Sequence, residues 1–176
     1  MNKSYDCLRL IIGGRVRRLG LLVWPDSDGL DNTDVQLHLQ IDCMDGIHRE
    51  ITCRTDSDGQ TLKVESEHWQ DGLPLSKLEE RTKIWSSPEF WNGPSGQAYE
   101  LFDVTSDRSF GIGQGSVVTE VNLVKFADDQ SDPTGVVIEF DSGTRLWSAP
   151  AAHGNQVSVN PQKFVWPAEI ELIPMT

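Results

Sequence analysis

Strict alternation of apolar and polar residues is the feature of this sequence that most limits its fold. In the segment VQLHLQI (35–41) every second residue is aliphatic, and the residues between them are glutamine or histidine. A period of two places successive side chains on opposite faces of an extended chain, so it predicts a half-buried strand. Similar runs separated by glycine turns recur along the chain. We therefore expect a mainly β protein, an antiparallel β-sandwich or barrel of about ten strands.

The segment QIDCMDGIHREI (40–51) predicts a hairpin whose register can be deduced. A two-residue turn at Asp45-Gly46 would pair Leu39 with position 52 and place Ile51 on the solvent side. A three-residue loop over 44–46 instead pairs Cys43 with Ile47 and Leu39 with Ile51, so that the apolar residues share a face. That loop class needs a left-handed residue at its third position, which is Gly46.

A similar hairpin, EFDSGTRLWSA, recurs at 139–149. It suggests two related four-stranded meanders, at 15–66 and 117–160, each with an acidic loop between its first two strands. Either the meander is duplicated, or two meanders merely share alternation and glycine turns. The matched pairs are Val16/Val118, Leu19/Val121, Leu21/Leu123, Leu22/Val124, Trp24/Phe126, Val35/Val136, Leu37/Ile138, Leu39/Phe140, Gly46/Gly143, Gly59/Gly154, Leu62/Val157 and Val64/Val159.

We expect a single domain over residues 1–176, with a first β meander (15–66), a helical and loop excursion (67–116) and a second β meander (117–176). LRLII (8–12) has the composition of a first strand. Within the excursion, a capping box at Ser76 predicts a short helix ending near Trp85, and AYELFDV (98–104) predicts a strand.

The charge balance is strongly acidic, with 15 Lys and Arg against 27 Asp and Glu and a net charge of −12. Such a field repels nucleic-acid phosphates and anionic lipids and attracts a basic partner, although it also serves solubility. The first dozen residues lack a secretory or membrane-spanning pattern. The three cysteines, Cys7, Cys43 and Cys53, have no CxxC spacing, so we expect no disulfide, no zinc site and a cytoplasmic location.

The sequence contains no recognisable catalytic motif, and we expect no enzyme activity, cofactor or metal. GIGQG (111–115) precedes a strand-like run rather than a helix, so it predicts no phosphate site. His38 and His48 are expected to be solvated. The two DSDG turns, at 26–29 and 56–59, place glycine fourth, whereas a calcium loop places it sixth. Arg15, Arg17 and Arg18 are expected on an outward strand face, paired with carboxylates.

The segment SVVTEVNLVKF…TGVVIEFDSGTRLWSA resembles the closing meander of small acidic bacterial immunity proteins, which are made beside contact-dependent or polymorphic toxins. The resemblance implies an inhibitor, a monomer or weak dimer, that neutralises a basic toxin or effector protein, often a nuclease. Carboxylates on the inhibitor would occupy the positive site that the toxin uses for phosphates. A carbohydrate- or small-ligand-binding β-sandwich module and a phage-type DNA mimic stay open as alternatives.

For the inhibitor, the expected partner-binding residues are of two kinds. Aspartates in the two acidic loops would attract the partner, and tryptophans of the excursion would anchor it, because tryptophan is enriched at interface hot spots. These residues are Asp26, Asp28, Asp31, Asp34, Asp128, Asp129, Asp132, Trp69, Trp85 and Trp91.

Overall fold

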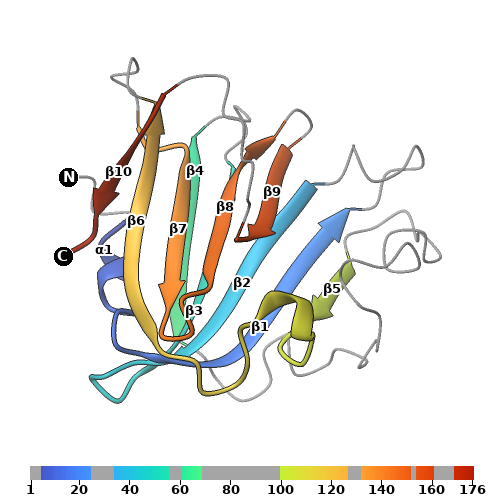
Figure 1. Cartoon of the computed structure of the whole chain (residues 1–176), viewed down its shortest axis with the longest axis vertical. Helices are drawn as coiled ribbons and strands as arrows, with labels where there is room; N and C mark the ends of the chain where they lie inside the picture. The colour runs from blue at the N-terminus through green and yellow to red at the C-terminus, as the bar shows by residue number, and fades with distance from the viewer. Residues whose placement is uncertain are drawn as a thin grey trace.

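The computed structural model describes residues 5–24, 34–55, 61–68, 100–126, 132–151, 154–160 and 169–176. These residues form two antiparallel five-stranded sheets that pack face to face (Figure 1). The predicted antiparallel, mainly β class is confirmed. Of the two architectures expected, the sandwich is found, since in the described residues neither sheet closes on itself.

The first sheet has the strand order β4-β3-β2-β1-β5, and the second has the order β10-β6-β7-β8-β9. The bounds in the first sheet are β1 (Arg15–Trp24), β2 (Asp34–Asp42), β3 (His48–Thr55), β4 (Leu62–His68) and β5 (Glu100–Asp103). The bounds in the second are β6 (Val118–Phe126), β7 (Gly135–Phe140), β8 (Arg145–Ala151), β9 (Gly154–Val159) and β10 (Ile170–Pro174). A helix, α1 (Asp6–Arg9), and a 3-10 turn, η4 (Arg108–Phe110), precede β1 and β6 respectively.

The two sheets repeat one topology. In each, four consecutive strands form an antiparallel meander, and a fifth strand returns to pair antiparallel with the first strand, β5 with β1 and β10 with β6. A break in register lies between Val16 and Arg18 in β1 and between Val118 and Glu120 in β6. The shared strand order and direction agree with the predicted repeat of 15–66 and 117–160. The repeat in the structure is larger, because it also includes a fifth strand in each sheet, β5 and β10, outside these ranges.

Along the first strand of each meander, the predicted residue matches agree with the structure, because the register break, a β-bulge, lies at matched positions in β1 and β6. Along the second and fourth strands, the predicted matches are wrong by two residues. Leu39 lies opposite Leu19, and Ile138 lies opposite Val121, so Leu39 corresponds to Ile138 and not to Phe140. The matches to correct are Val35/Val136, Leu37/Ile138, Leu39/Phe140, Leu62/Val157 and Val64/Val159. The reason is that the β2–β3 hairpin extends two residues further past the bulge on each strand than the β7–β8 hairpin.

The predicted three-residue loop at 44–46 is confirmed. The Cys43 amide donates to the Ile47 carbonyl at 3.0 Å, Leu39 pairs with Ile51, and Gly46 has a φ of 78°. The face is less uniform than expected, because Ile47 is 37% exposed at the end of the hairpin.

The expected strand at 8–12 is wrong, because α1 and a turn occupy this segment. An alternating strand would bury Leu8, Leu10 and Ile12 together. Instead Leu8 and Ile11 are fully buried while Leu10 is 48% exposed, which is the i, i+3 spacing of a helical turn. Gly13, with a φ of 79°, then allows the chain to turn into β1.

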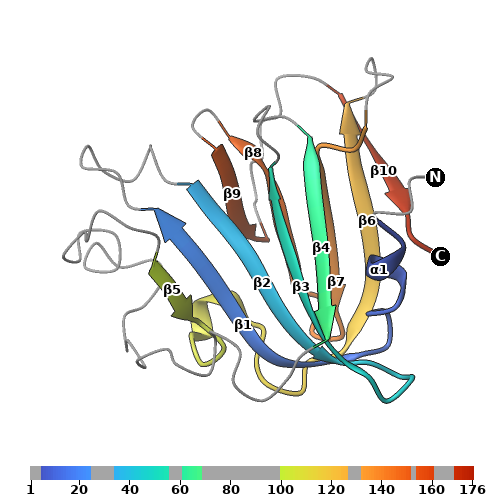
Figure 2. The same cartoon turned by 180° about the vertical axis from the view of Figure 1, so that it is seen from behind.

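One hydrophobic core joins α1 and the inner faces of both sheets. The sheets also join directly where β1 and β6 begin, because Arg15 and Val117 form an antiparallel bridge and the Gly13 amide donates to the Val118 carbonyl at 2.8 Å. Figure 2 shows this junction beside the β2–β3 hairpin. The loops 44–46 and 141–143 lie at this end of the sandwich, which we call the hairpin end.

The expected helix ending near Trp85 lies outside the described residues, as does the whole segment 69–99. The strand expected at 98–104 is confirmed as β5, and the run after GIGQG is strand β6, as predicted.

Candidate functional site

Three aspartate-rich connections between consecutive strands begin and end at the end of the sandwich that lies opposite the hairpin end. The connections join β1 to β2, β3 to β4 and β6 to β7, and their flanking strand ends lie at the upper end in Figure 1. The Leu62 amide at the start of β4 donates to the Pro133 carbonyl at 2.8 Å. The Asn155 side-chain amide at the start of β9 donates to the Val35 carbonyl at 2.6 Å. These contacts bring strand ends from both sheets together, and we call this the acidic end.

Two of the predicted partner-binding aspartates lie in the described residues, both at the acidic end. Asp34 is the first residue of β2, and Asp132, which is exposed, lies three residues before the first residue of β7. The other predicted positions lie outside the described residues: Asp26, Asp28, Asp31, Asp128, Asp129, Trp69, Trp85 and Trp91. The β3–β4 connection at 56–60 contains Asp56 and Asp58, which belong to a DSDG segment that predicts a turn and are not among the predicted partner-binding residues.

A second polar site lies on the outer face of the first sheet, where alternation directs the side chains away from the core. His38 on β2 was expected to be solvated, and this is wrong: its side chain is only 15% exposed. Its Nδ1 lies 3.0 Å from Glu50 Oε1 on β3, and the Gln40 amide nitrogen donates to the other Glu50 oxygen at 3.0 Å. Glu50 is 11% exposed and Gln40 1%. We call these three residues the outer-face cluster.

The cluster leaves two buried atoms without a hydrogen-bond partner in the described part of the chain, His38 Nε2 and Gln40 Oε1. Burial by itself would raise the pKa of Glu50, but the hydrogen bonds from His38 and Gln40 together outweigh it, so the pKa is lowered from its usual value. The carboxylate is therefore ionised at neutral pH. No simple sequence pattern reveals this cluster, because alternation assigns all three residues to the face expected to be wet.

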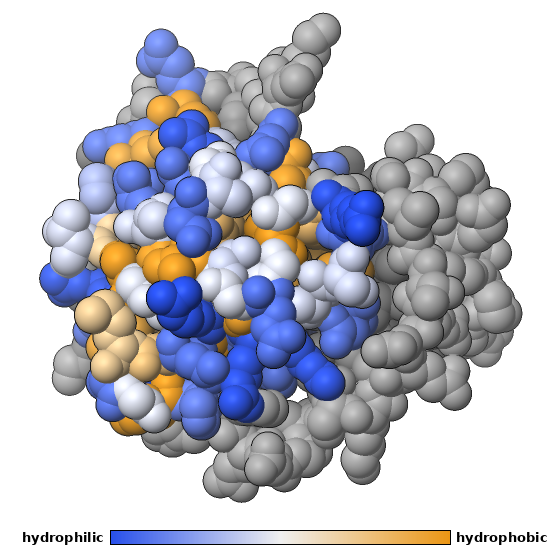
Figure 3. Space-filling model, turned by 60° about the horizontal axis from the view of Figure 1, so that its bottom comes forward, coloured by the Kyte–Doolittle hydropathy of each residue, from blue (hydrophilic) through white to orange (hydrophobic). Residues whose placement is uncertain are grey.

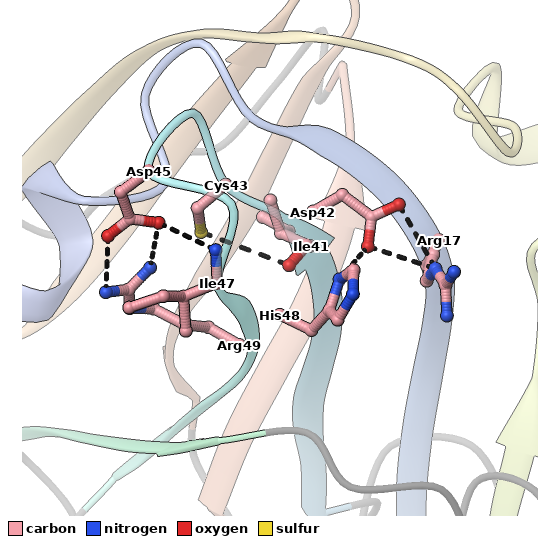
Figure 4. A network of polar contacts seen from close by, with 8 residues as sticks. All are labelled: Arg17, Ile41, Asp42, Cys43, Asp45, Ile47, His48 and Arg49. Atoms are coloured by element: carbon pink, nitrogen blue, oxygen red, sulfur yellow. Dashed lines mark hydrogen bonds and ion pairs between the residues drawn. The ribbon is translucent and has the colours of Figure 1, made fainter.

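A third polar network surrounds the β2–β3 hairpin (Figure 4). Asp42 contacts Arg17 at 3.0 Å and His48 Nδ1 at 2.5 Å, while Asp45 binds both terminal nitrogens of Arg49 at 2.8 and 2.7 Å. The Arg49 hydrogen bonds lower the pKa of Asp45 to about 2. Since Arg49 is 7% exposed, this ion pair compensates a buried charge and so has a structural role.

The predicted pairing of the early arginines with carboxylates holds for two of the three. Arg17 pairs with Asp42, and Arg18 lies 3.6 Å from Asp103 on β5, whereas Arg15 donates to the Gly115 carbonyl. Around them, hydrophilic residues cover most of the hairpin end, with smaller apolar patches between them (Figure 3).

The three cysteines are free thiols, with Cys43 and Cys53 buried. Burial raises the pKa of the Cys53 thiol, which makes it a poor nucleophile at neutral pH. In the part of the chain that the structure describes, no three His, Cys, Asp or Glu side chains gather as metal ligands would. The two helical pieces among the described residues, four and three residues long, are too short to cross a membrane.

No protein-family model matches this chain, and neither a curated protein nor a solved structure matches it. The arrangement of its own residues is therefore the basis for assigning a function.

Proposed function

We propose that this protein is a stoichiometric inhibitor, a bacterial immunity protein that binds and neutralises a basic toxin domain, a nuclease, in the cytoplasm. The observation that supports this proposal is the convergence of the strand ends that flank the acidic connections. Residues 25–34, 56–60 and 127–133 contain nine aspartates and no Lys, Arg or His. The hydrogen bonds from Leu62 to Pro133 and from Asn155 to Val35 hold the ends of these segments at one end of the sandwich.

The chemistry of a nuclease explains why such a surface would inhibit it. A domain that binds a phosphate backbone needs a positive surface, and a group of carboxylates competes for that surface as the nucleic acid does. Attraction between the two surfaces also raises the association rate, which an inhibitor needs when it must act before the toxin does. In this proposal Trp69, Trp85 and Trp91 supply desolvated anchors that slow dissociation.

A titration of toxin activity tests the proposal. The wild-type protein is used to capture its partner from native lysate, the partner is purified, and its nuclease activity is measured against increasing amounts of inhibitor. We expect a basic partner whose activity disappears at one molar equivalent. The matched variant replaces Asp26, Asp28, Asp31, Asp34, Asp128, Asp129 and Asp132 with Asn, and it should require a higher concentration for the same inhibition.

Two results would overturn the proposal. One is a captured partner that is acidic or whose activity is unchanged by a molar excess of this protein. The other is a sugar as the sole ligand, which would favour a carbohydrate-binding module.

A further inference from the structure

The two halves of the sandwich exchange equivalent hydrogen bonds at the junction where β1 and β6 begin. Val16 matches Val118, so three residues earlier Gly13 matches Gly115, and both glycines have a positive φ, 79° and 91°. The Gly13 amide donates to the Val118 carbonyl at 2.8 Å. The Gly115 amide donates to the Val16 carbonyl, also at 2.8 Å. Such an exchange is the mark of an approximate two-fold axis, so the two halves can be compared position by position.

Just before this junction, one half has a side chain where the other half has none. The Gly14 amide donates to the Ile11 carbonyl at 2.9 Å, and the Ser116 amide donates in the same way to the Gly113 carbonyl at 3.1 Å. Ile11 therefore matches Gly113. Ile11 is fully buried, whereas a Cβ at Gly113 would meet no atom within 4 Å. The space that a side chain fills in the first half is open in the second.

A cavity of about 280 Å³ lies beside Gly113, within the segment 105–113 that includes η4, and we call it the η4 cavity. Ile112 also lines it and is 1% exposed, while Ser106 and Arg108 are exposed. The cavity thus has an apolar floor and a polar mouth. Since a cavity of roughly 150 Å³ can hold benzene, this one has room for a ring-sized apolar group with a polar group attached.

Two of the polar groups that line the η4 cavity are engaged within the fold. The Thr105 hydroxyl accepts from the Leu19 amide at 2.8 Å and donates to the Asp103 carboxylate at 2.6 Å. The Gly113 amide donates to the Ser116 hydroxyl at 3.1 Å. These contacts hold the walls of the cavity, and they leave recognition of a ligand to other groups.

Arg108 supplies the positive charge of the η4 cavity. Arg17 and Arg18 each lie within 4.0 Å of a carboxylate, but no carboxylate of the described residues lies that close to the Arg108 guanidinium. A guanidinium in this state can bind the carboxylate of a ligand in bidentate geometry. Asp107 also lines the cavity, and the chain has a net charge of −12. A doubly charged anion would therefore be repelled more strongly than a singly charged one.

We propose that the η4 cavity binds a small monocarboxylate, whose ring-sized apolar body lies on Ile112 and whose carboxylate pairs with Arg108. The apolar floor, the open space at Gly113 and the guanidinium at the mouth are the features that this class of ligand matches. The cavity is distinct from the acidic connections, and the proposal does not rest on the inhibitor function.

The test is a titration of the full-length ¹⁵N-labelled protein, followed by NMR at constant ionic strength. The probe is sodium benzoate. Benzyl alcohol is the neutral control of similar shape, and phenyl phosphate, which carries close to two charges at neutral pH, is the dianionic control. We expect benzoate to shift the backbone amide signals of Gly111, Ile112 and Gly113 saturably. Benzyl alcohol should bind about tenfold more weakly or less, because it lacks the charge-assisted hydrogen bonds, and phenyl phosphate should also bind more weakly than benzoate.

Two variants and their matched controls make the assignment specific. Gly113→Ile restores the side chain that Ile11 supplies in the first half, and it should fill the cavity and weaken benzoate binding about tenfold or more. Gly113→Ala leaves most of the cavity open and should still bind. Arg108→Gln should reduce the affinity for benzoate to that for benzyl alcohol, without changing the affinity for benzyl alcohol. Arg145→Gln, at an exposed arginine outside the cavity, should bind benzoate as the wild type does.

Several results would overturn the proposal. They are the absence of a saturable shift with benzoate, equal affinities for benzoate and benzyl alcohol, and unchanged benzoate binding in Gly113→Ile. Tighter binding of phenyl phosphate than of benzoate would also overturn it and assign the cavity to phosphate esters. If Gly113→Ile does not fold, the wild-type titration and Arg108→Gln decide the question, because Arg108 is exposed and its replacement leaves the core intact.

Discussion

At the scale of single residues, the two hairpin loops depend on the same backbone geometry. Gly46 and Gly143 both have a φ of 78°, and a Cβ built on either would touch nothing within 4 Å. The cost of a side chain at these positions is therefore conformational strain alone. We expect Gly46→Ala and Gly143→Ala each to lower the free energy of unfolding by about 1–2 kcal/mol. Urea denaturation measures the change.

The matched control for both variants is Gly113→Ala. Gly113 also has open space around its Cβ position, but its φ is not in the left-handed region. This variant should be close to wild type in stability. An equal loss in all three variants would show that the left-handed φ is not the cause.

Asp45 gives a prediction for acid stability. Its pKa falls from the usual 3.8 to about 2 in the folded protein, first because of its hydrogen bonds to Arg49. A lowered folded pKa contributes stability above the unfolded value, and this contribution is lost as the pH falls through the folded one. In Asp45→Asn that contribution is absent. The difference in melting temperature between wild type and Asp45→Asn should therefore be largest above pH 5 and shrink as the pH falls from about 4 to 2.

Asp141→Asn in the second hairpin is the comparison for this measurement. The Asp141 carboxylate accepts a hydrogen bond from the Val117 amide and contacts no guanidinium in the described residues. If the difference in melting temperature between wild type and Asp45→Asn stays constant at all these pH values, the Arg49 contact does not control the titration of Asp45.

At the scale of elements, α1 shows where periodicity in a short segment is ambiguous. The segment LRLII before Gly13, four apolar residues and one arginine, fits a strand as well as a helical turn, and packing against the core decides between them. The turn that follows α1 buries Ile11 and exposes Leu10. We expect Ile11→Ala to cost about 2–5 kcal/mol of unfolding free energy and Leu10→Ala to cost little, as measured by denaturant unfolding. The reverse order would support a strand.

The meanders show how much of the fold can be predicted from sequence. Alternation and the Gly46 and Gly143 loops predict the strands, their antiparallel pairing and the β2–β3 register, because these depend on local geometry. The bulges after Val16 and Val118 have no such local pattern, since a bulge is defined by the partner strand. The sequence therefore does not reveal that the first hairpin is longer, and the residue matches that it predicts for the second and fourth strands are shifted by two.

At the scale of the whole molecule, the candidate sites depend on which strand ends and faces the fold brings together. The sequence predicts the acidic loops, but the added β3–β4 connection and the meeting of Leu62 with Pro133 follow from the packing of the two sheets. The outer-face cluster was missed for a related reason. Alternation assigns His38 and Glu50 to a solvent-facing side, but it cannot predict that their side chains are only 15% and 11% exposed.

The acidic end makes a kinetic prediction that distinguishes a binding surface from solvated turns. Attraction between opposite charges acts over about 10 Å at 0.1 M salt and weakens as salt increases. If the acidic end meets the partner, charge should govern association, whereas tryptophan anchors should govern dissociation. We expect Asp→Asn changes in the connections to leave stability nearly unchanged, because asparagine keeps the size of aspartate and removes only its charge.

The most direct measurement is surface plasmon resonance of the captured partner on wild type and on the Asn variant of the seven predicted aspartates, over a salt series. We expect an association rate that falls with salt for wild type, a slower and less salt-sensitive rate for the variant, and a nearly unchanged melting temperature. Association that is equally fast for both proteins and independent of salt would contradict it.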